Sequence, residues 1–104
     1  MMCAVTVRQI KPGTYEDFRK AWEPDPWLPQ LERAIILRNE DNTDQVLTIG
    51  FFDADQEALD HIRDDQSVLE EEDRRLRRIS DFEERVLLNG IFELVEEVRP
   101  PAGG

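Results

Sequence analysis

Gln45-Val46-Leu47-Thr48-Ile49-Gly50-Phe51-Phe52, continuing directly into residues 53–62, is the stretch that decides the fold of this chain. Its first half is rich in β-branched and aromatic residues, which indicates a buried strand. Asp53 then has the side chain of an N-cap, with Gln56 three residues later to complete a capping box. A buried helix face follows at helical spacing, formed by Ala58, Leu59 and Ile62. The stretch therefore predicts a strand that leads into a helix.

The overall composition limits the partners that the chain can have. With 104 residues it has the length of one domain with a modest core. The net charge of −11 excludes nucleic-acid and anionic-membrane partners, because phosphate binding needs clustered Lys and Arg. No segment approaches the roughly 20 apolar residues of a membrane span, and we expect no signal peptide. The single cysteine, Cys3, fits a reducing compartment. We therefore expect a cytoplasmic protein.

Further strand and helix patterns lie on both sides of the deciding stretch. Strand patterns occupy residues 3–10, 34–37 and 91–95, and helix patterns occupy residues 15–22 and 67–79. Residues 82–88 fit a helix, a loop or a strand.

The order of these elements is that of the ferredoxin-like β-α-β-β-α-β fold, with an antiparallel sheet and its helices on one face. This predicts an α+β fold with one domain over residues 1–99. Residues 100–104 are predicted to form a C-terminal tail.

The helix pattern at residues 67–79 is rich in charged side chains, and we call it the charged helix. It has a sequence signature for its start. Ser67 and Glu70 have the spacing of a capping box, which predicts that the helix begins at Ser67.

The predicted strands carry apolar side chains on both faces. In the strand at 45–52, Leu47 and Ile49 point to one face, and Val46 and Phe52 point to the other. The helices of one chain can cover only one of these faces, and an exposed apolar face of this size is an aggregation hazard. We therefore expect a second copy of the chain to cover the other face, forming a homodimer.

The chain resembles the dimeric α/β-barrel superfamily and, within it, the antibiotic-biosynthesis-monooxygenase-like family. The resemblance rests on the element order and on three motifs: the strand Val46–Phe52 running into an acidic cap, the helix Glu57-Ala58-Leu59-Asp60-His61, and the ending Phe92-Glu93-Leu94-Val95. It implies a homodimer whose two sheets face each other, with a pocket between the helices and the sheet of each subunit. Characterised members include cofactor-independent oxygenases of polycyclic phenols and haem-degrading enzymes.

The resemblance also argues against haem degradation by this chain. The haem-degrading members carry a tryptophan where this chain has His61, and a haem-ligating histidine where it has the acidic residues 71–73. They also carry an asparagine on the first strand, and residues 3–10 contain none.

Three side chains are candidates for acid–base chemistry. His61 is the only histidine of the chain and lies at the edge of a predicted buried helix face, where it is either catalytic or a structural residue of the core edge. Glu72 or Asp73 interrupts the apolar face of the charged helix, and such a carboxylate either faces a pocket or extends to solvent.

Aromatic residues are the candidates for ligand binding. They line a pocket, with the proline-rich loop at 25–29 as its rim, or they simply pack in the core. These residues are Tyr15, Phe18, Trp22 and Trp27. With one histidine and no H-x-x-x-H or C-x-x-C spacing, we expect neither a metal nor another cofactor.

Two functions fit these patterns. The first is a small homodimeric binding module for an aromatic or phenolic molecule, which the absence of a visible catalytic constellation favours. The second is a cofactor-independent monooxygenase-like enzyme that acts on an aromatic or polyketide-type substrate.

Overall fold

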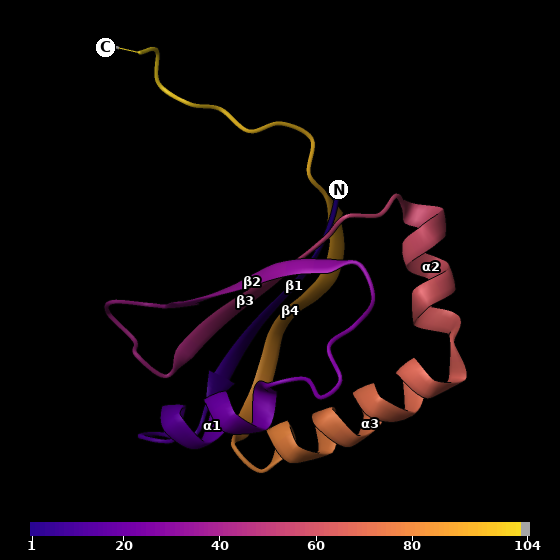
Figure 1. Cartoon of the computed structure of the whole chain (residues 1–104). Coiled ribbons are helices and arrows are strands. Elements are labelled where there is room, and N and C mark those ends of the chain that lie inside the picture. The colour runs from indigo at the N-terminus through magenta and orange to yellow at the C-terminus, as the bar shows by residue number, and fades with distance from the viewer. Residues whose placement is uncertain (103–104) are drawn as a thin grey trace.

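The computed structural model describes residues 1–102 of the chain, which form four strands and three helices (Figure 1). In chain order these are β1 (Met2–Ile10), α1 (Tyr15–Trp22), β2 (Leu31–Arg38), β3 (Gln45–Phe52), α2 (Gln56–Asp64), α3 (Gln66–Ser80) and β4 (Glu83–Glu93). The predicted order is confirmed, with the second helical segment divided into α2 and α3.

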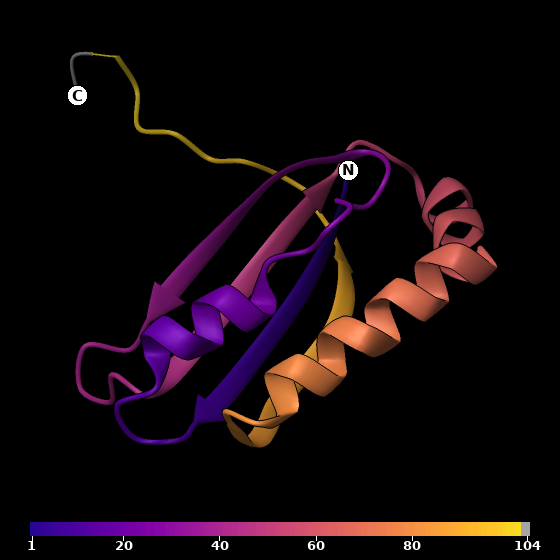
Figure 2. The ribbon, with the colours of Figure 1, turned by 60° about the horizontal axis from the view of Figure 1, so that its bottom comes forward.

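The four strands form one antiparallel sheet in the order β2-β3-β1-β4. The helices lie on one face of this sheet, with α1 and α3 side by side and α2 at one end, as Figures 1 and 2 show. The predicted ferredoxin-like α+β fold is therefore confirmed.

Strand β4 contains two residues more than its neighbour β1 can pair. Val7 lies opposite Leu88 and Arg8 opposite Val86, so Leu87 is left without a partner. Glu84 also has no partner, because Gln9 lies opposite Arg85 and Ile10 lies opposite Glu83. Residues 83–88, which fit several structures in the sequence, therefore form a strand with two irregularities, as β-bulges do.

Two aspartates cap the helices at positions that the sequence prediction missed. The cap of α2 is Asp55, not Asp53, because the Asp55 carboxylate accepts a hydrogen bond of 2.8 Å from the backbone N–H of Ala58. Helix α3 is capped by Asp65, not by Ser67.

Asp65 both follows the last residue of α2 and precedes the first residue of α3. Its carboxylate accepts hydrogen bonds from the hydroxyl and backbone N–H of Ser67 and from the backbone N–H of Val68. These bonds hold the pKa of the Asp65 carboxyl below its ordinary value. This one side chain therefore fixes the corner between the two helices.

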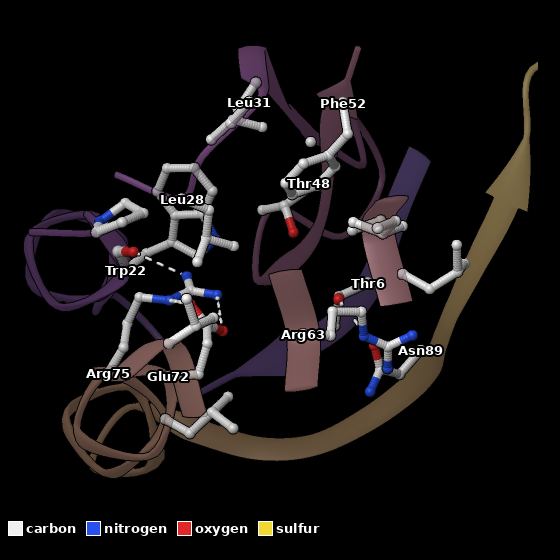
Figure 3. A pocket seen from close by; sticks show the side chains of 18 of the residues that line it. Thr6, Trp22, Leu28, Leu31, Thr48, Phe52, Arg63, Glu72, Arg75 and Asn89 are labelled. Carbon is white, nitrogen blue, oxygen red and sulfur yellow. Dashed lines mark hydrogen bonds and ion pairs between the residues drawn. The ribbon is translucent and has the colours of Figure 1, made fainter. Parts of the chain in front are cut away.

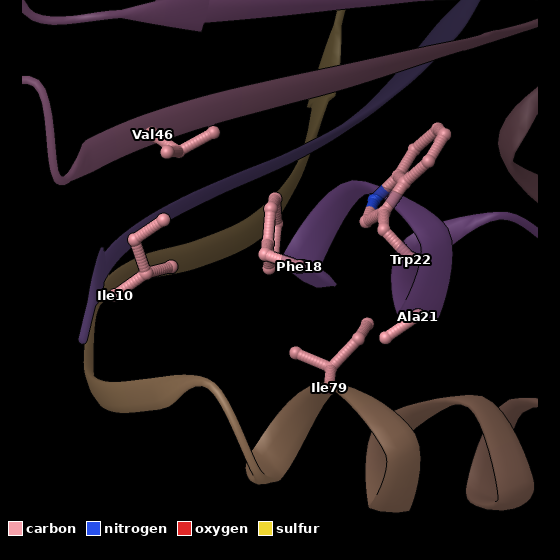
Figure 4. Packing of buried hydrophobic residues seen from close by; sticks show 6 residues of the cluster. All are labelled: Ile10, Phe18, Ala21, Trp22, Val46 and Ile79. Atoms are coloured by element: carbon pink, nitrogen blue, oxygen red, sulfur yellow. The ribbon is translucent and has the colours of Figure 1, made fainter. Parts of the chain in front are cut away.

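The hydrophobic core consists of two clusters on the helix-covered face. The larger one joins α1 and α3 to one end of the sheet (Figure 4), and its buried members are Ile10, Phe18, Ala21, Trp22, Val46 and Ile79. The smaller one lies under α2 at the other end, and its buried members are Met2, Phe52 and Leu59.

The opposite face of the sheet is apolar and carries no helix (Figure 2). In register across the strands lie Leu37, Leu47, Val7 and Leu88, and beside them Ile35, Ile49 and Val5. Leu37 and Leu88 are 52% and 45% exposed, respectively. We call this surface the open face.

After β4, residues 94–102 leave the sheet as an extended segment without regular secondary structure (Figure 1). The backbone N–H of Leu94 donates to the carbonyl of Met1, and Val95 and Val98 are exposed. The last two residues of the predicted tail at 100–104 lie outside the described residues. Within residues 1–102, no helix has both the length and the apolar character to cross a membrane.

Candidate functional site

A cavity of about 330 Å³ lies between the sheet and the helices α2 and α3 (Figure 3). Its walls come from the helix-facing side chains of all four strands, from the end of α1, and from the loop that follows α1. This volume is near the lower end of the roughly 300–1,000 Å³ of typical small-molecule sites. Most of the lining is apolar, with a few polar groups among it.

A row of small residues explains why the space is empty. Ala34, Gly50 and Ala4 lie directly opposite one another on three neighbouring strands, and all three line the cavity. Paired residues point to the same face of a sheet, so the three leave a shallow floor on which no large side chain stands. The helices bridge this floor without filling it. We call Ala34, Gly50 and Ala4 the small row.

The next row of the sheet is polar. Thr48, Thr6 and Asn89 lie opposite one another across β3, β1 and β4. The Thr6 hydroxyl donates to the side-chain oxygen of Asn89 at 3.2 Å. The Thr48 hydroxyl points into the cavity in Figure 3, although the residue is only 5% exposed. We call these three residues the polar row, which offers hydrogen-bonding groups beside the small row.

Glu72 and Arg75 form an ion pair on the α3 wall of the cavity. The Arg75 guanidinium donates to both carboxylate oxygens of Glu72, at 3.2 and 3.0 Å, and to the carbonyl of Trp22 at 2.9 Å. It also lies 5.5 Å from the centre of the Trp22 ring. Both charges are therefore satisfied within the protein, and the pair ties α3 to the end of α1.

Arg8 forms the second ion pair at the cavity. Its side chain is 5% exposed, and its Nε donates to Glu83 of β4 at 2.8 Å. Burial lowers the pKa of Arg8, and the contact with Glu83 opposes that change. Arg8 also lies 5.9 Å from the centre of the Phe18 ring. It marks the boundary between the cavity and the larger core cluster.

Arg63 of α2 is the third arginine at the cavity, and it lacks such a partner. It lines the cavity from an exposed position, and none of the ion pairs or side-chain hydrogen bonds within residues 1–102 includes it. In Figure 3 its guanidinium extends toward Thr6 and Asn89 of the polar row.

Two of the predicted site residues line the cavity. Trp22 forms part of the wall and is 7% exposed, and Glu72 lines it as the partner of Arg75.

The other two acid–base candidates lie outside the cavity. His61 is on the exposed side of α2, and Asp73 is exposed and paired with Arg77 at 2.5 Å. The catalytic roles predicted for these two residues therefore stay predictions, without support from a position in the cavity.

The remaining aromatic candidates lie around the site. Phe18 is fully buried in the larger cluster, and Tyr15 packs against it with ring centres 6.3 Å apart. Trp27 is 49% exposed and meets the Trp22 ring edge-on at 6.1 Å. Trp27 borders a shallow hollow next to Leu31 rather than the main cavity.

Sequence reasoning missed the polar row and the three arginines. A signal was present, because Thr6 and Arg8 stand on β1 at the same alternation as the buried residues Met2 and Ile10. Polar residues at buried strand positions are uncommon and point to a site or to a satisfied pair. Within residues 1–102, no group of three or more His, Cys, Asp or Glu side chains could hold a metal ion.

Comparisons with known proteins concern the fold. No family model matches the sequence, and no curated protein is significantly similar to it. Among solved structures, the chain is similar to SnoaB, a cofactor-independent oxygenase from Streptomyces nogalater. The TM-score is 0.70 and the identity 14%, over 95% of this chain and 97% of that one.

Two further structures are similar at the same level. A protein assigned as an antibiotic biosynthesis monooxygenase from Chloroflexus aurantiacus gives a TM-score of 0.67 at 10% identity, over 94% of this chain and 96% of that one. Rv0793 from Mycobacterium tuberculosis gives 0.61 at 11% identity, over 94% and 98%, respectively. These likenesses establish a shared fold.

Proposed function

We propose that this chain, which has the fold of antibiotic biosynthesis monooxygenase structures, is a member of that family and binds a small aromatic or phenolic molecule in its helix–sheet cavity. The observation that carries the proposal is the hollow above the small row, walled by apolar side chains and bordered by the polar row. Flat apolar rings suit such walls, and hydroxyl and amide groups at one side suit a phenol. Trp22 supplies an aromatic wall held by Arg75.

The same proposal includes a homodimer through the open face. Its support is the register of apolar side chains across all four strands, of which Leu37, Leu88 and Phe92 are about half exposed. A second sheet packed on this face would remove the apolar surface from water, which is the main favourable term in association.

Light scattering tests the dimer. We expect twice the 12.2 kDa of one chain. Ile49→Asp, on the open face, should shift the mass to that of one chain, whereas Val98→Asp in the exposed C-terminal segment should leave it unchanged. A wild-type mass of 12.2 kDa at micromolar concentration would contradict this part of the proposal.

Ligand binding is tested with 2-naphthol followed by NMR titration. Ala4→Leu adds bulk to the small row and should abolish saturable binding. Ala58→Leu is the matched control, because Ala58 lies on α2 and does not line the cavity. Equal binding by wild type and Ala4→Leu, with both folded by circular dichroism, would place the ligand elsewhere.

The oxygenase activity of SnoaB favours a second function, cofactor-independent monooxygenation. In that reaction 1,5-dihydroxynaphthalene and O₂ would give 5-hydroxy-1,4-naphthoquinone and water, with the phenol as the only reductant. An oxygen electrode should then record one O₂ consumed for each quinone formed, without added cofactor.

The same assay tests the predicted catalytic residues. Unchanged turnover in His61→Ala would contradict a catalytic role for that histidine, and Glu72→Gln and Asp73→Asn test the carboxylates in the same way. Saturable binding without O₂ uptake would leave the binding module as the function.

A further inference from the structure

We propose that the ligand of the cavity carries a carboxylate, which Arg63 binds at the mouth while the apolar body of the ligand lies over the small row. This inference rests on the proposed binding function and specifies the chemical class of its ligand. It follows from the charges around the cavity, from the order of the small row and the polar row on its floor, and from the Asp65 carboxylate that caps the nearby start of α3.

Within the described residues 1–102, the charges around the cavity leave one cation unpaired. Arg75 is neutralised by Glu72, and Arg8 by Glu83. Arg63 has no ion-pair partner within residues 1–102, although the acidic residues Asp60 and Asp64 flank it on α2. In a protein with a net charge of −11, a cavity with one surplus positive charge stands out from its surroundings.

The floor of the cavity gives the ligand a direction. The small row offers space for an apolar body, and the polar row beside it offers the hydroxyls of Thr6 and Thr48 and the amide of Asn89. Arg63 extends toward the same side in Figure 3. A carboxylate placed there could accept hydrogen bonds from the guanidinium and from a neighbouring hydroxyl or amide, while its ring covers Ala4 and Gly50.

A phosphate group fits this arrangement less well. Phosphate sites draw on several cations or on free backbone N–H groups at a helix start. The start of α3 is close to the cavity, since Val68 lines it, but Asp65 already accepts hydrogen bonds from the N–H groups of Ser67 and Val68. Arg63, the one cavity arginine without an ion pair in the described part of the chain, matches the single charge of a carboxylate.

A neutral phenol would not need Arg63 at all, because the polar row alone can satisfy a hydroxyl group. A carboxylate ligand would therefore bind through Arg63, whereas a phenol would bind through the polar row alone. This difference allows one pair of probes with the same ring system to separate them.

The experiment compares 2-naphthoate with 2-naphthol at neutral pH by isothermal titration calorimetry. We expect wild type to bind 2-naphthoate more tightly. Arg63→Gln should raise the Kd for 2-naphthoate by about tenfold, as the loss of a charged hydrogen bond implies, and leave the Kd for 2-naphthol within about twofold. Arg63→Lys keeps the charge and should retain part of the preference.

Lys20→Gln is the matched control for the total charge. Lys20 is exposed on α1, lies away from the cavity lining, and forms none of the ion pairs within residues 1–102. Its replacement should leave the Kd for both probes unchanged. An equal loss of 2-naphthoate affinity in Lys20→Gln and Arg63→Gln would show that the effect arises from the net charge of the protein alone. This result would overturn the assignment of Arg63 as the carboxylate-binding residue.

The remaining outcomes separate this inference from the function on which it rests. Equal affinity for the two probes, or no change in Arg63→Gln, would overturn the carboxylate inference and leave aromatic binding in place. Failure of both probes to bind folded wild-type protein would contradict the proposed binding function, and the inference would fall with it. Circular dichroism of each variant establishes that it is folded.

Discussion

The helix-covered face of the sheet has a filled end, formed by the larger core cluster, and a hollow end, where the cavity lies between that cluster and the smaller one. Both ends are built from the same central strands. At the filled end, Ile10 of β1 and Val46 of β3 pack against Phe18 and are almost fully buried. At the hollow end, the same alternation on the same strands brings Ala4 and Gly50 to the surface of the sheet. The backbone is continuous between the two ends, and only side-chain size and polarity change.

This difference shows how one small domain can provide both stability and a site. Close-packed side chains at the filled end supply apolar burial, which is the main stabilising term. The hollow end buries less apolar surface. Polar contacts therefore stabilise its walls, namely the Arg75–Glu72 pair and the aspartate caps of α2 and α3. Substitutions at the two ends should therefore differ in the size of their effect on stability.

The largest effect is expected at the filled end. Phe18→Ala should lower the free energy of unfolding by about 3–5 kcal/mol, because Phe18 is fully buried and its loss leaves a cavity. Trp27→Ala, at a half-exposed aromatic residue, should cost only about 0.5–1.5 kcal/mol through the lost contact with Trp22. Urea denaturation measures both values. Similar losses in the two variants would contradict the expected difference between a fully buried and a half-exposed aromatic residue.

The boundary between the two ends should show an intermediate effect. Glu83→Gln removes the charge that faces buried Arg8, and should lower the free energy of unfolding by about 1–3 kcal/mol. The control is Glu71→Gln, which removes a more exposed partner of Arg74 and should change that free energy by at most about 1 kcal/mol. If the urea midpoints of these two variants coincide, the Arg8 pair contributes no more than a surface contact.

The corner between α2 and α3 should give a smaller effect that depends on pH. The folded-state pKa of Asp65 is lowered, so its carboxylate contributes stability that is present above the unfolded pKa of about 3.9 and is lost as pH falls through the folded value. Asp65→Asn should therefore lower the melting temperature at pH 7, and its difference from wild type should shrink as the pH falls below about 4.

Asp53→Asn is the control for this prediction, because Asp53 is exposed and its side chain caps neither helix. Thermal unfolding followed by circular dichroism between neutral and acidic pH measures both variants. A difference between Asp65→Asn and wild type that stays constant over this range would contradict the assigned cause.

The smallest effect is expected from filling the hollow end. A Cβ atom added at Gly50 would lie 3.3 Å from Cδ1 of Leu31, the flexible end of a side chain that can shift. Gly50→Ala should therefore raise the free energy of unfolding by less than about 1 kcal/mol, because alanine loses less conformational freedom than glycine. The same variant should weaken 2-naphthol binding, since the cavity becomes shallower. Unchanged stability together with unchanged binding would show that Gly50 is not part of the floor.

The sequence predicted the fold well because periodicity carries the needed information. The β-branched and aromatic run at residues 45–52 and the element order lead to the antiparallel sheet and its helix-covered face, and both are confirmed. The starts of α2 and α3 were misplaced by two residues, since several acidic and hydroxyl side chains near each of these helices could serve as a cap. Only the fold selects Asp55 and Asp65.

The site was harder to predict because it depends on register between strands. Ala4, Ala34 and Gly50 are ordinary residues in sequence, and their alignment in one row appears only when β1, β2 and β3 are paired. Trp22 was one of four aromatic candidates for ligand binding, and it is the one that lines the cavity. Arg63 directly follows the stretch at 53–62, and nothing in the local sequence indicated that its side chain borders a cavity.

The two unpaired residues of β4 shift the register of this strand against β1 by two residues. Counted in steps of two from Asn89, which faces Thr6, an uninterrupted strand would bring Arg85 opposite Ile10. The extra residues Leu87 and Glu84 bring Glu83 to that position instead, where it reaches Arg8. A deletion of both would make the strand regular and leave Glu83 opposite Ile10, whereas a regular pairing that kept both residues would bring Arg85 there and replace attraction to Arg8 by repulsion. The two irregularities of β4 therefore decide which charge lies beside Arg8.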